Sequence, residues 1–408
     1  MSDTWVDVPD GSHFPIHNLP YGVFSRPGER PRVGVAIGDF VLDLAGVSAA
    51  GLLDAPDRGG VRDWFACDAL NAFMAAGPRA WRATRERLTE LLTDSAYADR
   101  VRSHLTPRAE VTLHLPWRVA DYVDFYSSQH HAENVGRIFR PDQQPLTPNW
   151  KHLPIGYHGR AGTVVCSGTP IVRPCGQRKA PGDPAPTFGP SRRLDIEAEV
   201  GFVVGVPSKL GEPVAVERFR EHVFGVVLVN DWSARDIQAW EYVPLGPFLG
   251  KSFATSVSPW VVPLDALEAA RITPPAQDPE PLPYLRGGEG LDLALEIRLN
   301  GTVVSRPPFA AMYWTPAQQL AHLTVNGASL RTGDLYASGT VSGPERSQRG
   351  SLLELAWNGA EPVKLEDGST RVFLEDGDTV SISATAPGTG GVRIGFGEVV
   401  GTIEPARR

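Results

Sequence analysis

The chain has 408 residues, of which 42% are hydrophobic, and its formal net charge at pH 7 is -8. A chain of this length can bury a large core, organised as two domains or as one large domain. Its acidic balance and the lack of any lysine and arginine block argue against nucleic acid or anionic lipid as partners. No apolar run reaches the length of a membrane span, so a membrane partner is not expected either.

The cysteines and the first residues bear on the cellular compartment. Cys67, Cys166 and Cys175 are odd in number and lack CxxC spacing, so reduced thiols are expected. Met1 to Trp5 show no basic segment followed by an apolar stretch, so no secretory signal is predicted. Together these features predict a cytoplasmic protein.

Residues 1–115 are predicted to form a small N-terminal domain. Short strands are expected at 33–37 and 40–42, and a helix is predicted within 78–102, where apolar side chains recur at helical spacing. Strands and long loops dominate afterwards, which places a second domain at 116–408. The 42 glycines and 37 prolines favour a turn-rich β architecture.

The segment 121–134 is dense in chemically active side chains. It contains Asp124 and, a few residues later, the adjacent His130 and His131. One interpretation is a site that supplies an acid and an imidazole. The alternative is a capping aspartate and a core histidine with satisfied hydrogen bonds.

Three carboxylates alternate in Asp195-Ile196-Glu197-Ala198-Glu199, just before the apolar run 200–204. On a β-strand these side chains would share one face. Like charges this close repel in apolar surroundings, and a hard divalent cation such as Mg2+ or Ca2+ would relieve the repulsion. The alternative is a solvated strand face opposite basic residues on neighbouring strands.

A buried strand that begins at Phe224 is predicted to end in polar residues, among them Asp231. Because strand ends present side chains to ligands, Asp231 could complete an oxygen site begun by Glu197 and Glu199. It could instead cap a helix expected over 233–240.

Later in the chain, alternation of apolar and polar residues predicts a half-buried strand over 291–299. Asn300-Gly301 then predicts a hairpin turn. Three long loops rich in proline and glycine are candidate lids or interface arms. They cover residues 179–190, 272–289 and 339–350.

Two lone charges fall in apolar surroundings. Lys251 lies among small and apolar residues, where a buried ammonium needs an anion. Glu354 lies in the strand-like run Ser351-Leu352-Leu353-Glu354-Leu355 and needs a buried partner. A histidine would suit it, because a carboxylate can orient an imidazole for general-base chemistry.

With these segments in place, the chain resembles the fumarylacetoacetate hydrolase (fumarylacetoacetase) family from Trp5 to about Pro405. The resemblance implies a mainly β, α+β fold, with a small N-terminal SH3-like β-barrel domain that also has helices, and a large mixed β-roll catalytic domain. The segments that carry it are 121–140, 152–160, 230–236, 242–251, 338–345 and 353–355.

The resemblance also implies roles for individual residues. A divalent metal, Mg2+ or Ca2+, would be held by Asp124, Glu197, Glu199 and Asp231, with Lys251 and Thr255 beside it. The general base would be His131, oriented by Glu354, although the adjacent His130 is a second candidate. The departing carbanion would be stabilised by Arg235, Gln238 and Lys251. The substrate would be contacted by Tyr126, Arg140, Tyr157, Gln238, Tyr242 and Thr340. Asp195 then falls outside the metal ligands.

The activity implied by the resemblance is hydrolysis of the carbon–carbon bond of 4-fumarylacetoacetate, a small β-diketo acid, to fumarate and acetoacetate. This reaction is the last step of tyrosine and phenylalanine catabolism, and the resemblance implies a homodimer. The alternatives on the same scaffold are another β-diketone or acylpyruvate hydrolase, a decarboxylase or an isomerase, which generally lack the N-terminal domain. A Ca2+-binding adhesion module is the alternative from another class, and it predicts a secreted chain with disulfides.

Overall fold

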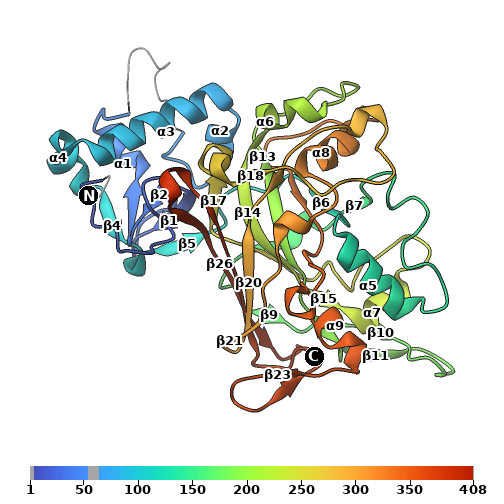
Figure 1. Cartoon of the computed structure of the whole chain (residues 1–408). Coiled ribbons are helices and arrows are strands. Elements are labelled where there is room, and N and C mark those ends of the chain that lie inside the picture. The colour runs from blue at the N-terminus through green and yellow to red at the C-terminus, as the bar shows by residue number, and fades with distance from the viewer. Residues whose placement is uncertain (1–3, 54–63, 408) are drawn as a thin grey trace.

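The structure is a computed structural model that describes residues 4–53 and 64–407. It is an α+β fold dominated by sheet, as predicted, and Figure 1 shows the N-terminal part of the chain as a blue lobe beside a larger lobe. The prediction about a secretory signal used Met1 to Trp5. Of these, Met1 to Asp3 lie outside the described residues. Within those residues, no helix is long and apolar enough to cross a membrane.

The N-terminal strands form one end of a 13-stranded sheet. Their bounds are β1 (Tyr21–Ser25), β2 (Arg32–Ile37), β3 (Phe40–Asp43), β4 (Leu105–Pro107) and β5 (Thr112–His114), which confirms the two predicted strands. β1 also pairs with β17 (Trp260–Pro263), so the sheet continues into the larger lobe. Among the described residues, no pairing closes β1 to β5 into a ring, and the SH3-like barrel that was expected is an open sheet.

Four α-helices accompany these strands within residues 4–53 and 64–107. They are α1 (Leu44–Ala49), α2 (Asn71–Met74), α3 (Pro78–Thr93) and α4 (Ala98–Arg102), so the helix predicted within 78–102 is present as α3 and α4. Trp81 and Leu88 of α3 are buried in one core cluster with Tyr21 of β1 and Phe224 of the larger lobe. The two lobes therefore share apolar packing as well as a sheet.

The larger lobe continues the main sheet in the order β17, β14, β13, β22, β6 and β7. The bounds are β6 (Tyr122–Phe125), β7 (Gly156–His158), β8 (Val164–Cys166), β13 (Ala198–Val204), β14 (Val223–Asp231), β16 (Thr255–Val257) and β22 (Leu335–Ala337). Every residue of β13 and β14 is buried, as expected for strands with near-continuous apolar runs that are covered on both faces. The strand predicted to begin near Phe224 is confirmed.

A second, five-stranded sheet packs with β13 and β14 in another core cluster, which includes Val200, Leu228 and Ile382. Its strands are β21 (Thr302–Ser305), β20 (Ala294–Leu299), β25 (Thr379–Pro387), β26 (Arg393–Glu404) and β9 (Ile171–Val172). The alternation predicted over 291–299 is confirmed in β20, and Asn300 and Gly301 turn the chain with φ values of 50° and 82°. β25 alternates buried and half-buried residues throughout, which is the pattern of a strand with one face on the core.

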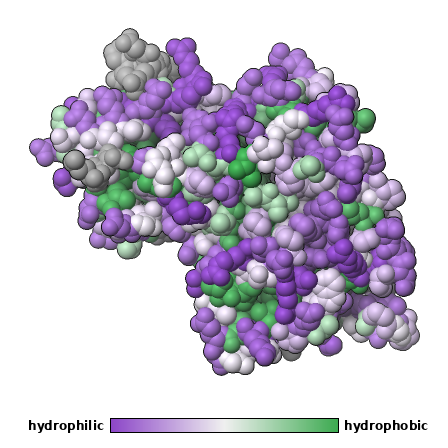
Figure 2. All heavy atoms as spheres, in the orientation of Figure 1, coloured by the Kyte–Doolittle hydropathy of each residue, from purple (hydrophilic) through white to green (hydrophobic). Residues whose placement is uncertain are grey.

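The remaining strands form four two-stranded sheets. They are β10 (Cys175–Arg178) with β11 (Thr187–Pro190), β12 (Leu194–Asp195) with β15 (Ser233–Ala234), β18 (Arg271–Ile272) with β19 (Gly290–Leu291), and β23 (Val363–Lys364) with β24 (Thr370–Arg371). The helices of the larger lobe are α5 (Gln129–Phe139), α6 (Phe219–His222), α7 (Arg235–Glu241), α8 (Pro316–Thr324) and α9 (Leu352–Leu355). Figure 2 shows that hydrophobic side chains reach the visible face in separate patches on a mostly hydrophilic surface.

Two sequence predictions are wrong in detail. The run that contains Glu354 was expected to be strand-like, but it forms the helix α9, because the Ser351 hydroxyl accepts from the backbone N–H of Glu354 and caps it. The strand expected over 195–199 is interrupted, since β12 ends at Asp195 and β13 begins at Ala198. The prediction of reduced cysteines holds, as all three are free.

Candidate metal centre and catalytic residues

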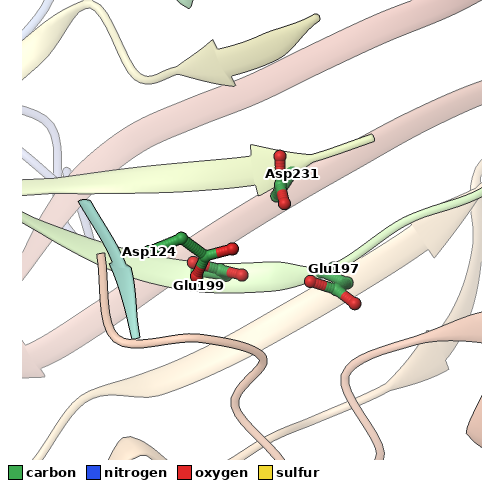
Figure 3. Close-up of side chains that lie close together, drawn as sticks. All are labelled: Asp124, Glu197, Glu199 and Asp231. Atoms are coloured by element: carbon green, nitrogen blue, oxygen red, sulfur yellow. The ribbon is translucent and has the colours of Figure 1, made fainter. Parts of the chain in front are cut away.

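Four carboxylates from separate parts of the chain converge in one buried cluster. Asp124, Glu197, Glu199 and Asp231 each offer one oxygen, and these four oxygens lie within 4.8 Å of one another. Figure 3 shows the four side chains. None of the four residues is more than 6% exposed. The solvated strand face considered for Glu197 and Glu199 is therefore wrong, because these acids lie inside the protein.

The sheet register explains this convergence. β13 and β14 run antiparallel with Ala198 opposite Asn230, which brings Glu199 and Asp231 to the same end of the pair. The backbone N–H of Asp231 also donates to the carbonyl of Glu197 at 3.0 Å. On the other side of β13, β22 pairs in parallel with β6 and sets Asp124 beside them.

The helix-capping alternatives for two of these acids are also wrong. Asp231 is the last residue of β14, and α7 begins after Ala234, which makes no side-chain capping bond. Asp124 lies within β6, and Ser128 caps α5 by accepting from the backbone N–H of His131. Both aspartates are therefore free to act in the cluster.

Lys251 has the buried anions that its apolar sequence context requires. Its Nζ lies 2.6 Å from Oε2 of Glu197 and 2.7 Å from Oδ2 of Asp231. Beside it, the Thr255 hydroxyl donates to Oδ1 of Asp231 at 3.0 Å. Both residues therefore lie at the carboxylate cluster.

Arg160 is a member of this site that the sequence reasoning did not identify. Its Nη2 lies 2.8 Å from Oδ2 of Asp124 and 2.7 Å from Oδ2 of Asp231, with the side chain only 4% exposed. The guanidinium also stacks 4.8 Å from the ring centres of Tyr122 and Tyr157. Its sequence signal was weak, because the residue lies in a loop with φ of 62°, where spacing predicts no neighbour.

The acids in the cluster differ in their surroundings. Both carboxylate oxygens of Glu199 and Oδ1 of Asp124 are buried without a hydrogen-bond partner among the described residues. Burial, reinforced by neighbouring carboxylates, raises the pKa of Glu199 well above its usual range. Burial and Asp231 raise the pKa of Asp124 to about 6, against the opposing charge of Arg160.

Glu197 behaves in the opposite way. Burial alone would raise its pKa, but the charges of Lys251 and Arg235 outweigh burial and lower the pKa below its usual range. The cluster therefore combines compensated oxygens with buried oxygens that have no partner. Unpartnered carboxylate oxygens in an all-oxygen site are the donors that a hard divalent cation requires, so the cluster fits such a metal.

A histidine and a glutamate form a second unit of the site. Nδ1 of His131 lies 2.8 Å from Oε2 of Glu354, and both side chains are buried. Asn134, Ser342 and Ser351 donate further hydrogen bonds to the same carboxylate. Glu354 thereby has the buried histidine partner that the sequence analysis required.

This pairing also separates the two adjacent histidines. Burial would raise the pKa of Glu354, but the contact with His131 and the hydrogen bonds to the carboxylate lower it. Nδ1 of His131 is held by a carboxylate, which leaves Nε2 available for proton transfer. His130 is half-buried and makes no side-chain hydrogen bond among the described residues.

Arg235 joins the carboxylate cluster from the first position of α7. Its Nη1 lies 2.8 Å from Oε1 of Glu197 and donates to Oε1 of Gln238 at 3.3 Å. Its Nε lies 2.8 Å from Oδ2 of Asp195. Arg235 and Lys251 thus contact different oxygens of Glu197, and Gln238 lies beside Arg235.

Three of the residues predicted to contact substrate lie close to these groups. The rings of Tyr126 and His131 meet edge to face with centres 5.4 Å apart. The Tyr157 hydroxyl donates to Oδ2 of Asp124 at 2.9 Å. Thr340 is buried and its hydroxyl has no partner among the described residues.

The loop that carries Thr340 approaches β6 closely. At Gly339, whose φ is 75°, a Cβ would lie 2.1 Å from the carbonyl oxygen of Phe125, so only glycine fits there.

Arg140 and Tyr242, which were also predicted to contact substrate, are less closely tied to the cluster. Arg140 follows α5 and donates to the carbonyl of Pro145 at 3.0 Å. Burial raises the pKa of Tyr126, and the charge of Arg140 opposes this rise. Tyr242 follows α7 and is 49% exposed, without a side-chain hydrogen bond among the described residues.

The fold and site define a class of protein. A mixed α+β fold that buries a carboxylate cluster of metal-binding type next to a histidine–glutamate pair is the arrangement of an enzyme, not of an adhesion module. The family model described as the fumarylacetoacetate hydrolase C-terminal region matches residues 121–404, and the one described as the fumarylacetoacetase N-terminal region matches residues 17–116. The chain belongs to the fumarylacetoacetate hydrolase family.

Individual proteins give the same result. The chain is 50% identical over 417 residues to fumarylacetoacetase from Homo sapiens and 51% identical over 418 residues to fumarylacetoacetase from Caenorhabditis elegans. Each alignment covers 99% of this chain and 99% of the relative.

Among solved structures, a fumarylacetoacetate hydrolase from Exiguobacterium antarcticum has a TM-score of 0.56 and 18% identity. That comparison covers 95% of this chain and 100% of the other. A 5-carboxymethyl-2-hydroxymuconate delta-isomerase from Mycobacterium smegmatis has a TM-score of 0.51 and 16% identity, over 96% and 100% of the two chains. At these identities the structures show a shared fold.

Proposed function

We propose that this protein hydrolyses the carbon–carbon bond of 4-fumarylacetoacetate to fumarate and acetoacetate, the last step of tyrosine and phenylalanine catabolism. The observation that carries the proposal is the identity of about half of all residues, over 99% of both chains, to curated fumarylacetoacetases. An isomerase on the same scaffold is the runner-up, but the isomerase structure is only 16% identical.

We infer that Mg2+ or Ca2+ binds at Asp124, Glu197, Glu199 and Asp231, with Lys251 and Thr255 beside it. The unpartnered oxygens of Glu199 and Asp124 support this inference. When bound, the metal would supply Lewis-acid chemistry and draw electron density from the oxygens of the β-diketone. The all-oxygen donor set suits either cation.

His131 is the proposed general base. Its Nε2 would take a proton from the water that attacks a substrate carbonyl, while Glu354 at 2.8 Å holds Nδ1 and stabilises the imidazolium that forms. The carbon–carbon bond then breaks, its electron pair stays with the acetoacetate carbon, and the imidazolium can return the proton to that carbon. No serine or cysteine nucleophile is needed in this scheme.

The departing carbanion needs positive charge and hydrogen-bond donors. Arg235, Gln238 and Lys251 are proposed to supply them, and the contacts of Arg235 and Lys251 with Glu197 support this grouping. The proposed substrate contacts are Tyr126, Arg140, Tyr157, Gln238, Tyr242 and Thr340. A planar guanidinium such as that of Arg140 suits a substrate carboxylate, which it can bind through two parallel hydrogen bonds.

We also propose that residues 1–115 and 116–408 are separate domains, and that the protein is a cytoplasmic homodimer. The domain division is supported by a change from N-terminal to C-terminal family match after residue 116. The dimer is supported by exposed apolar side chains in one segment: Val243 is 67% exposed, Leu245 95% and Phe248 67%. Large apolar groups left in solvent this densely are typical of contact surfaces.

The test is turnover of fumarylacetoacetate by the purified protein, with the products quantified. Equal amounts of fumarate and acetoacetate are expected as substrate disappears. Release of carbon dioxide would instead identify a decarboxylase, and a rearranged product of unchanged mass would identify an isomerase. Size measurement in solution should give about twice the mass of one chain.

A further inference from the structure

Asp195 is a fully buried carboxylate that takes no part in the carboxylate cluster. Its Oδ1 accepts from the backbone N–H of Ile196 at 2.7 Å and of Leu352 at 2.8 Å. Its Oδ2 accepts from the backbone N–H of Leu353 at 3.1 Å and from Nε of Arg235 at 2.8 Å. Both oxygens are therefore fully engaged with donors from three parts of the chain.

Two of those parts carry proposed catalytic groups. Leu352 and Leu353 are the first residues of α9, and the next residue, Glu354, holds Nδ1 of His131 at 2.8 Å. Arg235 is the first residue of α7, and its Nη1 lies 2.8 Å from Glu197. One carboxylate thus holds both the helix that orients the base and the guanidinium beside the carboxylate cluster.

This link depends on both oxygens of Asp195 being hydrogen-bond acceptors. All four of its partners are N–H donors, and one of them carries a charge, so the site offers nothing for a donor group. An asparagine of the same shape would turn its NH2 either toward the N–H groups of Ile196 and Leu352 or toward those of Leu353 and Arg235. In either orientation two N–H groups, one of them from α9, would lose their acceptor and face another donor.

We propose that Asp195 is a positioning residue, which fixes α9, with its Glu354–His131 pair, and Arg235 at the separation that the reaction needs. The inference rests on the proposed function, because it concerns the proposed base and the proposed carbanion-stabilising group. Asp195 touches neither substrate nor metal in this scheme. Its effect reaches the reaction through Glu354 and Arg235.

The experiment compares Asp195→Asn with the parent in turnover of fumarylacetoacetate. Misplacement of reacting groups by about 1 Å can cost about 100-fold in rate, so kcat should fall by about that factor. KM should stay within about threefold, because an interaction used only in the transition state changes kcat rather than ground-state binding. A larger change in KM with kcat intact would overturn the proposal.

Asp378→Asn is the matched control. Asp378 is also buried, accepts from Nε of Arg371 at 2.9 Å and from the backbone N–H of Glu375 at 2.7 Å, and lies outside the site. It should lower the melting temperature without lowering kcat. If both variants lose stability and both keep kcat within about twofold of the parent, Asp195 is merely structural and the proposal fails.

A double-mutant cycle with Arg235→Gln tests the route of the effect. Once Arg235 is removed, Asp195→Asn should reduce kcat by a smaller factor than it does in the parent, because part of its role has gone. Independent, multiplying losses would contradict the link.

Asp195→Ser, which leaves room for water at the freed N–H groups, is the second variant. Failure of both Asp195 variants to fold would overturn the proposal in favour of a folding role. An inactive parent would refute the proposed function, whereas an active parent with an equally active Asp195→Asn refutes only this inference.

Discussion

Replacing Arg160 by glutamine removes the guanidinium that joins Asp124 to Asp231. Both ion pairs are short, at 2.8 Å and 2.7 Å, and all three side chains are buried. Removing one partner of a buried ion pair costs about 3–5 kcal/mol, because it leaves an uncompensated charge. With an unfolding entropy of about 2.1 cal/mol/K per residue, the metal-free protein should melt about 3–6 °C lower.

A divalent cation should offset much of this loss. When bound at the carboxylates, it would neutralise the charges that Arg160 no longer compensates, so the melting deficit should shrink in saturating Mg2+ or Ca2+. Linkage then requires that the variant bind the cation more tightly than the parent, by about tenfold for each 1.4 kcal/mol recovered. Compared with the parent, Arg160→Gln should therefore have a lower melting temperature without metal and a higher affinity for the cation.

The assay combines thermal unfolding with and without metal and calorimetric titration of chelator-treated protein. Arg173→Gln is the control, since Arg173 is a buried guanidinium paired with Asp376 at 2.6 Å and bonded to the carbonyl of Ser191 at 3.0 Å, away from the cluster. Its melting deficit should be equal in both conditions. The reasoning is refuted if Arg160→Gln shows an equal deficit with and without metal, or binds the cation more weakly than the parent.

Three further outcomes follow from the site. His131→Ala should lose single-turnover rate by at least about 100-fold with little change in substrate binding, because a general base contributes about 10²–10⁴; a rate within a few-fold of the parent would show that another group is the base. Exhaustive chelation should abolish turnover, and added Mg2+ or Ca2+ should restore it; full activity after metal removal would count against the carboxylate site. Glu354→Gln should cost stability at neutral pH, because the folded-state pKa of Glu354 is lowered and its contribution is fully present above the unfolded pKa of about 4.3. That cost should fade as pH falls through the lower folded pKa, and a pH-independent deficit in urea titrations would contradict the assignment.

Much of the fold could be read from local patterns. The alternation in β20, the Asn300-Gly301 turn and the unbroken apolar run of β14 all predict strands that the structure contains. These patterns are predictive because a strand with one buried face alternates apolar and polar residues, and a strand with two buried faces is apolar throughout. No local pattern predicts the pairing of β1 with β17, because the paired residues are distant in the sequence.

The same distinction applies to the site residues, because some lie in a local sequence pattern and others do not. Glu197 and Glu199 were identified because alternating acids before an apolar run are unusual, whereas Arg160 lies in a loop with no periodic pattern. Glu354 was assigned to a strand because a short run with three leucines fits either a strand or a helix. Ser351 followed three residues later by Glu354 is a helix-start pattern that would have favoured α9.

The arrangement of β6, β13 and β14 has a consequence for folding itself. Because side chains alternate between faces, a slip of β14 by one residue against β13 would replace Asp231 by Asn230 at the cluster and turn the aspartate away. Only a correctly assembled sheet can then gather all four acids around an ion. A metal ion bound there would therefore stabilise the native strand register selectively, because a shifted register would not present all four ligands to it.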